Sequence, residues 1–522
     1  MRFEADVFFE LSKKLPADAE KSLKEFFNNA NKDFLKKGAP EGKENEGTTI
    51  EEYRIMPKDI FLSLNSGRYV RVHTGIMRLN NELSKFLGKK YHLGVRSINV
   101  KRFEIDMELE QKPIEPIKLP FTKNIDFDRS KAHIVLDPKD LDETALKKNY
   151  IDKLLNRLND KIRAQNLAAG KAAFSETVKR SEKRLDKYVI KEDPTEEALR
   201  RGWVKEFPGA GVWTIMPPFT ALIRAIEQLV IDKIIKPMGF VETIFPRLIP
   251  LEVERKKGHL AIPNELFWVC PPTSRNPKDF EQYVDYVEIT GDPAPDQLQA
   301  MLRPPMFGLA YAQCEPFYQI FEKEIVDIDD LEMNPILFFD RNGPTWRWEG
   351  GGLKGLERLN EFHRIEFTYM STPKKTIEIR DEILKRSEEI IDSIFDMEYR
   401  IDKTTAVYLE HAGVAEQEEA EEFVKTYDLT AILPFETSSR PEAELEISSY
   451  HVHTDFYAER FNFKDKAGKD VWTGCVGIGP SRWAYVFVIR HGFKFENWPQ
   501  EIKKYVGAEL PKTPQLVTWP KK

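Results

Sequence analysis

The stretch Thr345–Met370, TWRWEGGGLKGLERLNEFHRIEFTYM, decides how the rest of the chain is interpreted. It predicts a strand, a loop opened by glycines and a second strand. Because side chains two apart in a strand share a face, Arg347 should lie beside Glu349, and Arg364 beside Glu366. One interpretation is a solvated hairpin face with mixed charges. The other is a polyphosphate site whose carboxylates orient a cationic partner.

Length and composition predict a globular protein of two or three domains. The chain has 522 residues, of which 41% are hydrophobic and 32% charged. Acidic residues interrupt the apolar N-terminal run, so it predicts neither a secretory signal nor a membrane helix. Three cysteines cannot form a disulfide framework. We therefore expect a cytoplasmic protein with no membrane partner.

Charge is distributed unevenly along the chain. Residues 1–205 carry 42 Lys and Arg against 34 Asp and Glu, or +8, and the remainder carries 37 against 52, or −15. The two values sum to the net charge of −7. A basic N-terminal part followed by an acidic remainder suggests that the N-terminal part binds a polyanion. The alternative is that these basic residues form an ordinary solvated surface.

The first 140 residues predict an α+β domain. Apolar patterning predicts strands at Phe3–Leu11, Arg68–His73 and Ser97–Leu109. It predicts helices between them, at Asp18–Lys37 and Gly75–Leu87.

A long polar tract, Asp140–Tyr188, follows and predicts helix broken near residues 166–170. Its cations could track phosphates, or the tract could be a solvated linker. They are Lys153, Arg157, Lys161, Arg163, Lys179, Arg180, Lys183 and Arg184.

A second domain is predicted from about Pro208–Pro218, where Gly, Pro and Trp become frequent. Thr220–Lys236 predicts an amphipathic helix, and an extended segment follows. Lys375–Lys425 predicts acidic helices, and Glu444–Phe463 predicts a strand with an irregular continuation.

Near the C-terminus, Thr473–Gly492 predicts a strand, a Gly-x-Gly turn and a helix. The turn allows close approach of a ligand, and Arg482 lies in the first turn of the helix, where anions bind readily.

Three features in this order resemble motifs 1, 2 and 3 of the class II aminoacyl-tRNA synthetases. They are a helix with a strand ending at Pro246, a hairpin with Arg-x-Glu and a second Arg, and Gly-x-Gly-x-x-Arg before a helix. The resemblance covers about residues 207–522.

Two shorter stretches of sequence are similar to the seryl-tRNA synthetases. LERLNEFHRIEF, from Leu356, resembles the second half of their motif 2, and EISSYHVHTDFYAERFNF, from Glu446, resembles the segment before motif 3. Val452 stands where the ordinary family has Asn, and the N-terminal part lacks a heptad coiled coil. Both departures, together with VCPPTSRNP, resemble the rare, zinc-dependent methanogen type.

The resemblance implies an α+β architecture: a class II catalytic domain built on an antiparallel sheet, and an N-terminal α+β domain that binds tRNA. The expected division is residues 1–165 for tRNA binding, 166–206 for a helical linker and 207–522 for catalysis, with a helical insertion at about 394–430. The implied activity is ATP-dependent ligation of serine to tRNA(Ser), and also tRNA(Sec), through a seryl-adenylate.

The resemblance also implies residue roles. Arg347 would bind the ATP α-phosphate and Arg482 the γ-phosphate, for which bidentate guanidinium groups are suited. Phe362 would stack on adenine, with Phe367 as the lower-ranked alternative. Further ATP contacts would come from Glu349, Arg358, Leu359 and Glu446, the last through Mg²⁺, and serine contacts from Ala312, Arg347, Arg364 and Glu366.

A metal site follows from the same resemblance. Cys314, Glu366 and Cys475 would hold one zinc ion per subunit, with a fourth position open to the deprotonated amino group of serine. Without the resemblance, two core cysteines and a salt-bridged glutamate are the ordinary interpretation. Cys270 is expected to be a buried apolar residue, and the histidines show no ligand spacing.

Partners and alternatives complete the prediction. The motif 1 helix implies a homodimer. The segment Tyr408–Val424 resembles a helix-turn-helix, but its acidic faces argue against DNA binding. The alternatives are a class II synthetase for another small amino acid and a non-catalytic paralogue that binds tRNA.

Overall fold

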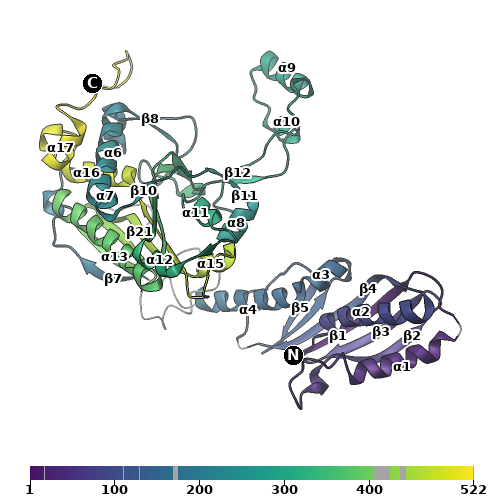
Figure 1. The fold of residues 1–522 in the computed structure, drawn as a ribbon. Helices are drawn as coiled ribbons and strands as arrows, with labels where there is room; N and C mark the ends of the chain where they lie inside the picture. The colour runs from purple at the N-terminus through teal and green to yellow at the C-terminus, as the bar shows by residue number, and fades with distance from the viewer. Residues whose placement is uncertain are drawn as a thin grey trace. The chain divides into compact units, whose positions relative to one another are not determined.

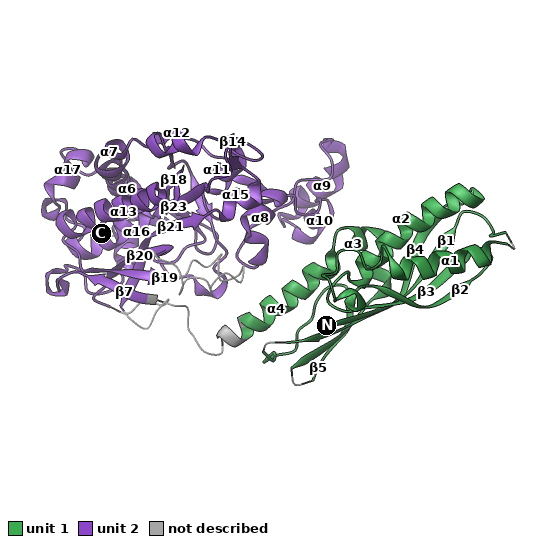
Figure 2. Ribbon diagram, turned by 60° about the horizontal axis from the view of Figure 1, so that its bottom comes forward, with its two compact units in different colours: residues 1–172 green, residues 173–522 purple. Residues whose placement is uncertain are grey.

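The chain forms two compact units, Met1–Ala172 and Ala173–Lys522, which are described separately (Figure 2). The structure is a computed structural model. It describes residues 1–16, 18–109, 111–128, 130–168, 175–404, 424–435 and 443–520.

The first unit is built on a six-stranded antiparallel sheet in the order β2-β3-β1-β4-β6-β5. In β1 every second side chain is buried, which is the pattern of a strand with one covered face. Helices α1 and α2 pack against the sheet (Figure 1). The elements are β1 Arg2–Leu11, α1 Ala19–Lys32, β2 Thr49–Ile55, β3 Asp59–Ser66, α2 Val72–Tyr91, β4 Val95–Glu108, β5 Thr122–Asp128, β6 Lys131–Leu136, α3 Glu143–Lys147 and α4 Tyr150–Ala168.

Most predictions for this unit are confirmed, but the strand expected at Arg68–His73 is wrong. The strand lies earlier, at β3, where it pairs with both β1 and β2. Val70 has a φ of +35°, and α2 begins at Val72. Val70 and Val72 therefore lead into α2, and the strand between β1 and β2 is formed by β3.

The second unit is built on an eight-stranded sheet in the order β10-β15-β18-β23-β21-β20-β19-β7. All neighbouring pairs are antiparallel except β10 with β15. This arrangement confirms the predicted α+β class. The strands are β7 Ser175–Arg180, β10 Val241–Glu242, β15 Ile336–Asp340, β18 Ile365–Ser371, β19 Tyr399–Thr404, β20 Thr426–Ile432, β21 Glu444–Thr454 and β23 Trp472–Ile478.

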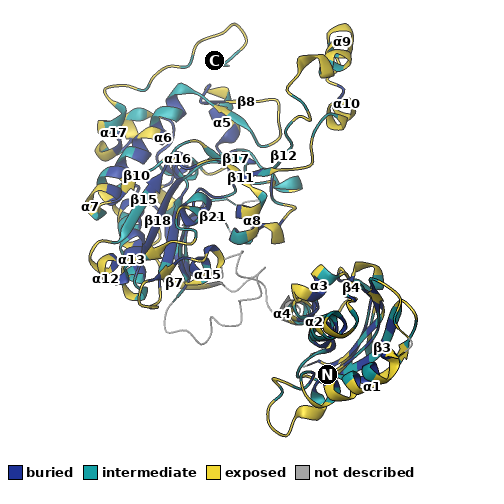
Figure 3. Cartoon of the chain, turned by 45° about the vertical axis from the view of Figure 1, so that its right-hand side comes forward, coloured by how far each residue is buried: buried dark blue, intermediate teal, exposed yellow. Residues whose placement is uncertain are grey.

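Long helices pack on this sheet and bury its apolar residues (Figure 3). The predicted amphipathic helix is confirmed as α6 Pro217–Val230, which continues through a π-helical turn at Ile231–Ile235 into α7 Lys236–Met238. Gly239, with a φ of +79°, ends it. The others are α13 Pro373–Glu389, continued by Ile390–Ile394, α16 Pro480–His491 and α17 Gln500–Val506.

Shorter elements connect these layers. They are α5 Thr195–Arg200, β8 Val204–Glu206, β9 Trp213–Ile215, β11 Leu248–Pro250, α8 Leu251–Lys257, β12 Trp268–Val269, α9 Glu281–Thr290, α10 Pro295–Ala300, β13 Phe307–Leu309, α11 Glu315–Ile320, β14 Ile325–Val326, α12 Ile328–Met333, β16 Pro344–Trp346, β17 Glu361–His363, α15 Phe456–Phe461 and β22 Lys464–Asp465.

Residues 277–300 form an excursion between β12 and β13. None of the residues of α9 or α10 is buried, and several are exposed apolar side chains (Figure 3). Its base is narrow, because Thr273 N donates to Met301 O at 2.9 Å and Arg303 N donates to Pro271 O at 2.8 Å.

The predictions for three segments of this unit are wrong in part. Residues 175–180 form β7 and not a helical linker, and residues 399–404 form β19. These two strands pair with each other, a long-range contact that local charge patterning cannot reveal. The bounds predicted for a helical insertion, 394–430, therefore include β19 and the first residues of β20, and residues 405–423 between these strands lie outside the described residues. The irregular stretch after β21 contains a helix, α15.

Candidate functional site

Two rows of side chains meet on one face of the sheet because its strands pair in register. Glu366 of β18 lies opposite Gly477 of β23, and Gly477 lies opposite Ser449 of β21. Cys475 lies opposite Thr368, two residues after Glu366. Opposite residues in antiparallel strands share a face. The register therefore places Glu366 and Cys475 on the same side.

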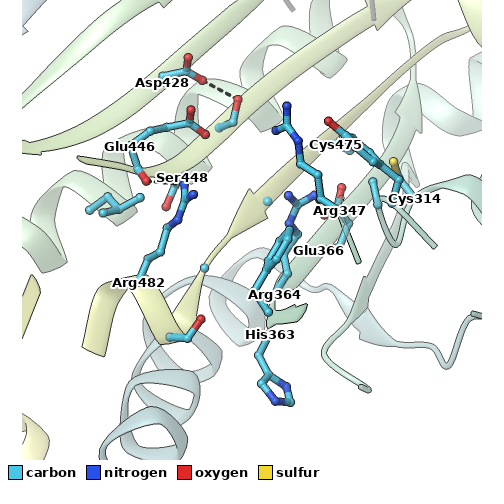
Figure 4. Close-up of a pocket in the computed structure, with 18 of the residues that line it drawn as sticks. Cys314, Arg347, His363, Arg364, Glu366, Asp428, Glu446, Ser448, Cys475 and Arg482 are labelled. Carbon is cyan, nitrogen blue, oxygen red and sulfur yellow. Dashed lines mark hydrogen bonds and ion pairs between the residues drawn. The ribbon is translucent and has the colours of Figure 1, made fainter. Parts of the chain in front are cut away.

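This face forms the floor of a cavity of about 260 Å³. Figure 4 shows Cys314 and Cys475 on one side of it, Glu446 and Arg482 on the other, and Arg364 between them. Eleven of the residues assigned a role from the sequence line this cavity: Ala312, Cys314, Arg347, Glu349, Leu359, Phe362, Arg364, Glu366, Glu446, Cys475 and Arg482.

The two arginines predicted to hold phosphates reach the cavity from separate elements. Arg482 lies in the first turn of α16, and its Nη1 donates to the carbonyl oxygen of Glu446 at 2.8 Å. Arg347 Nη2 is 2.9 Å from a carboxylate oxygen of Glu265, and its Nε is 3.4 Å from Glu349. Both guanidinium groups are thus available at one cavity, each steadied by an acceptor.

The predicted hairpin is shorter than expected. β16 ends at Trp346, before Arg347, and the glycine run forms a 3₁₀ turn at Gly350–Gly352. The expectation that Arg347 and Glu349 share a strand is therefore wrong, although their side chains do meet. Arg347 N donates to Asn360 O at 3.0 Å, which still fixes its position against the second arm.

The residues predicted to contact adenine and ATP include some that line the cavity and one that supports a lining residue. Phe362 lines the cavity, whereas Phe367 is fully buried and packs edge-on against Phe240, with ring centroids 5.2 Å apart. This contrast agrees with the ranking of Phe362 above Phe367. Arg358 does not line the cavity, but its Nε donates to Glu349 and holds that carboxylate in place.

The three predicted metal ligands come together. One ligand atom of each of Cys314, Glu366 and Cys475 lies within 4.8 Å of the others, and all three residues are buried. Cys314 directly precedes α11, and the other two lie on β18 and β23. Ligands about 2.0–2.3 Å from one zinc ion lie at most about 4.6 Å apart, so small side-chain movements complete this donor set.

Electrostatics concentrates negative charge on Cys314. A hydrogen bond with Cys475 and the nearby Lys257 ammonium hold the pKa of the Cys314 thiol well below its ordinary value. The hydrogen bond with Cys314, together with burial, raises the pKa of Cys475. Burial, reinforced by the charge on Cys314, raises the pKa of Glu366 to about 8. Arg364 Nη1 is 3.4 Å from the Glu366 carboxylate and partly offsets this effect.

Lys257 and His259 are functional-site residues that the sequence did not single out. Lys257 Nζ is 2.9 Å from Cys314 Sγ. His259 Nδ1 is 3.1 Å from Glu254 and 2.9 Å from Glu315, and both carboxylates are fully buried. Burial opposes protonation of His259, but these hydrogen bonds raise its pKa to about 9. Both residues lie in the run EVERKKGH. In sequence this run looks like the basic end of any helix, so it does not indicate a functional site.

A group of polar side chains beside the cysteines was also not predicted from the sequence. Ser449 Oγ donates to Asp428 Oδ1 at 2.5 Å and lies 2.9 Å from His451 Nε2. These residues and Thr426 line the cavity, and burial lowers the pKa of His451 to about 3, which keeps the ring neutral. Cross-strand register places them together, which one strand read alone could not indicate.

Cys270 departs from its prediction. It is only partly buried, beside β12, and it does not line the cavity. Among the residues that the structure describes, no helix is both long and apolar enough to cross a membrane.

Two family models match the chain. Residues 1–160 match a tRNA-binding domain, and residues 305–488 match the class II tRNA synthetase core domain (G, H, P, S and T).

Full-length relatives share a common description. The chain is 37% identical to the type-2 serine--tRNA ligase of Methanocaldococcus jannaschii, over 100% of this chain and 99% of the relative. It is 36% identical to that of Methanothermobacter thermautotrophicus, over all of both chains. It also resembles the solved M. kandleri SerRS, crystallised in complex with A. aeolicus tRNASec. The TM-score is 0.85 and the identity 32%, covering 99% of each chain.

Proposed function

The chain belongs to the type-2 serine--tRNA ligases, which are class II aminoacyl-tRNA synthetases, and from this premise we propose how its cavity activates serine. Serine and ATP would bind side by side and form a seryl-adenylate with release of pyrophosphate, and serine would then pass to tRNA(Ser) with release of AMP. The observation that carries this proposal is that two thiols and a carboxylate meet at one side of a cavity that also holds Arg347 and Arg482.

The ATP side would be formed by residues from both arms of the hairpin, β21 and the first turn of α16. Arg347 would bind the α-phosphate and Arg482 the γ-phosphate, while Phe362 stacks on adenine. Glu446 would bind ATP through Mg²⁺. In-line attack of the serine carboxylate on the α-phosphorus needs alignment and charge stabilisation more than a protein nucleophile, and fixed guanidinium groups provide both.

The serine side is formed by the cysteine cluster. Cys314, Glu366 and Cys475 would hold zinc, since two thiolates and one carboxylate suit this ion and leave a fourth position. When bound, zinc supplies a Lewis-acidic position for the amino group of serine. Arg364, whose guanidinium lies beside Glu366, would contact serine, and Ala312 would border the amino acid.

The first unit would present tRNA to this cavity. Its match to a tRNA-binding domain supports that role, and the basic excess of residues 1–205 fits a polyanionic partner. The similar M. kandleri protein was crystallised with tRNASec, which supports tRNA(Sec) as a second substrate. We also propose a homodimer formed through α6 and the neighbouring edge strand β10.

Amino-acid-dependent exchange of pyrophosphate into ATP tests the proposal. Serine should support exchange, and threonine should be poorer by about 10- to 200-fold, the range that one methyl group produces in an ordinary pocket. Exchange with another small amino acid and not with serine would identify a different synthetase. Absence of exchange with any amino acid would identify a tRNA-binding paralogue.

A further inference from the structure

Lys257 is a buried cation directly beside the cysteine cluster. It is the last residue of α8, is 3% exposed, and its Nζ lies 2.9 Å from Cys314 Sγ. The same Nζ lies 4.4 Å from the ring centroid of Tyr457 and 4.7 Å from that of Tyr318. The two rings stack on each other, with centroids 4.0 Å apart, and the ammonium lies beside this pair and against the sulfur atom.

A lysine in this position is costly unless its charge is used. Removing an ammonium group from water is unfavourable unless opposite charge and hydrogen bonds compensate for it. Cation–π attraction to the two tyrosine rings recovers part of this cost. The negative charge on Cys314, within hydrogen-bond distance of the ammonium, recovers a further part.

Counting the charges of the loaded site shows what the ammonium supplies. Two thiolates and one carboxylate carry −3 and a divalent ion carries +2, so the cluster retains −1. The ammonium of Lys257 cancels this charge. With the guanidinium of Arg364, 3.4 Å from Glu366, the cluster and its two cations sum to +1. A bound amino acid with a neutral amine and an ionised carboxylate carries the complementary −1.

The sulfur contact has a second consequence. A charge-assisted N–H···S hydrogen bond withdraws electron density from Cys314 and so weakens its donation to a bound metal. Two thiolates and a carboxylate would otherwise satisfy the ion so fully that an uncharged amine would bind weakly. The hydrogen bond therefore preserves affinity at the fourth position.

We propose that Lys257 is a positioning residue that tunes the Cys314–Glu366–Cys475 site so that it accepts the amino group of serine. It does this by donating a hydrogen bond to Cys314 and by cancelling the residual charge of the cluster. The proposal rests on the zinc site of the proposed function. Lys257 acts through Cys314 and has no need to contact serine itself.

Cobalt substitution separates this role from simple packing. Co²⁺ bound by thiolates gives a sulfur-to-metal charge-transfer band whose energy reports the donor strength of sulfur. Lys257→Met removes donor and charge with similar volume, Lys257→Arg keeps both, and Lys257→Gln keeps a donor alone. Lys256→Met is the matched control, since the neighbouring Lys256 pairs with Glu322 at 2.8 Å and does not line the cavity.

We expect Lys257→Met to move the charge-transfer band to longer wavelength and to raise the KM for serine by about 10- to 100-fold, with the KM for ATP unchanged. Zinc affinity, measured by competition with a chelator, should change in the same variant. Lys257→Arg should largely retain the wild-type band, and Lys256→Met should retain it fully.

Each outcome has a defined meaning. An unshifted band and an unchanged KM for serine in Lys257→Met would overturn the role of Lys257. A wild-type protein that gives no thiolate band with Co²⁺ would instead overturn the metal site itself. If Lys257→Met does not fold, Lys257→Gln compared with Lys257→Arg decides, since only the uncharged variant should shift the band.

Discussion

Position in the fold distinguishes Cys475, a proposed zinc ligand, from Cys270, which is not one. Cys475 is buried on β23 and faces Cys314 and Glu366, whereas Cys270 is partly exposed beside β12. Cys475→Ala should therefore reduce bound zinc from about one ion per subunit to a small fraction, because two ligands hold this ion poorly. Cys270→Ala should keep its zinc. Elemental analysis of the two purified variants measures both, and equal metal content would remove the site.

His491 makes stability depend on pH. Burial lowers its pKa from 6.5 to about 4, and its Nε2 lies 2.9 Å from the carbonyl oxygen of Phe395. The unfolded chain therefore binds the proton more readily between pH 6.5 and 4. The stability that the neutral ring provides is present above pH 6.5 and is lost as pH falls toward 4, by up to about 3 kcal/mol.

His491→Gln is the matched variant for this effect, because its amide can still donate to Phe395 O but cannot ionise. We expect the unfolding free energy of the wild type to fall more steeply than that of the variant from pH 7 to pH 4. Denaturant unfolding at several pH values measures the difference. Parallel pH profiles would show that His491 does not contribute.

The sequence could identify individual residues only where a motif surrounds them. Arg347, Glu349, Arg482 and the three proposed ligands were assigned roles because the sequence around them is similar to that of a known family. Lys257 was not, because Lys256 and Lys257 are equivalent in sequence and only the turn of α8 directs one to Cys314 and the other to Glu322.

At the scale of elements, the backbone of β23 sets the width of the site. Gly477 lies opposite both Glu366 and Ser449, and a Cβ atom there would lie 3.2 Å from Arg364 Cδ and 3.3 Å from Glu366 Oε2. Gly477→Ala should therefore displace both side chains and raise the KM for serine roughly 10-fold or more. Steady-state exchange kinetics measure the change.

Gly94→Ala is the control for backbone effects, since nothing lies within 4 Å of a Cβ atom placed there. It should leave both serine KM and melting temperature near the wild-type values. An unchanged KM for serine in Gly477→Ala would mean that the strands separate enough to accept the methyl group.

Elements with strong local patterns were predictable, and elements defined by distant partners were not. The amphipathic pattern of α6 and the glycine turn before α16 are local, and both were found. β7 and β19 are rich in charge and lie next to helical sequence, so the charge pattern predicts helix. They are strands because β7 pairs with β19, more than two hundred residues away, and β19 pairs in turn with β20.

At the scale of the molecule, the two compact units suggest a division of labour. Deleting residues 1–165 should abolish charging of tRNA(Ser) but spare much of the serine-dependent exchange, because the cavity is lined entirely by the second unit. Aminoacylation and exchange assays on one preparation measure both. Unchanged charging would contradict this division.

A longer deletion, of residues 1–206, serves as a comparison. It also removes β7, which leaves the edge of β19 unpaired, and the buried Tyr188, Trp203 and Val204, so this variant should lose stability as well as charging. Equal exchange activity and equal melting temperatures in the two truncated proteins would show that β7 is dispensable.

The proposed homodimer would form through the opposite edge of the sheet. β10 is the edge strand there, and Val241, Ile244 and Leu248 around it are 54%, 76% and 50% exposed. Exposed apolar side chains at a sheet edge mark an interaction surface. Ile244→Lys should therefore weaken dimerisation at least about tenfold, by the cost of burying an unpaired charge.

Light scattering during size-exclusion chromatography measures the mass over a range of concentrations. Val178→Lys is the control, because Val178 is 50% exposed on β7, at the other end of the sheet. A dimer that tolerates Ile244→Lys would place the interface elsewhere.

The excursion between β12 and β13 has a practical consequence for protein engineering. Its two ends leave the second unit side by side, and Thr273 N donates to Met301 O at this point. A two-residue Asn-Gly turn could therefore replace residues 274–300 and convert the base into a tight hairpin. None of the removed residues lines the cavity. The result would be a trimmed enzyme better suited to crystallisation, and the turn would offer a point for attaching a dye or an affinity tag.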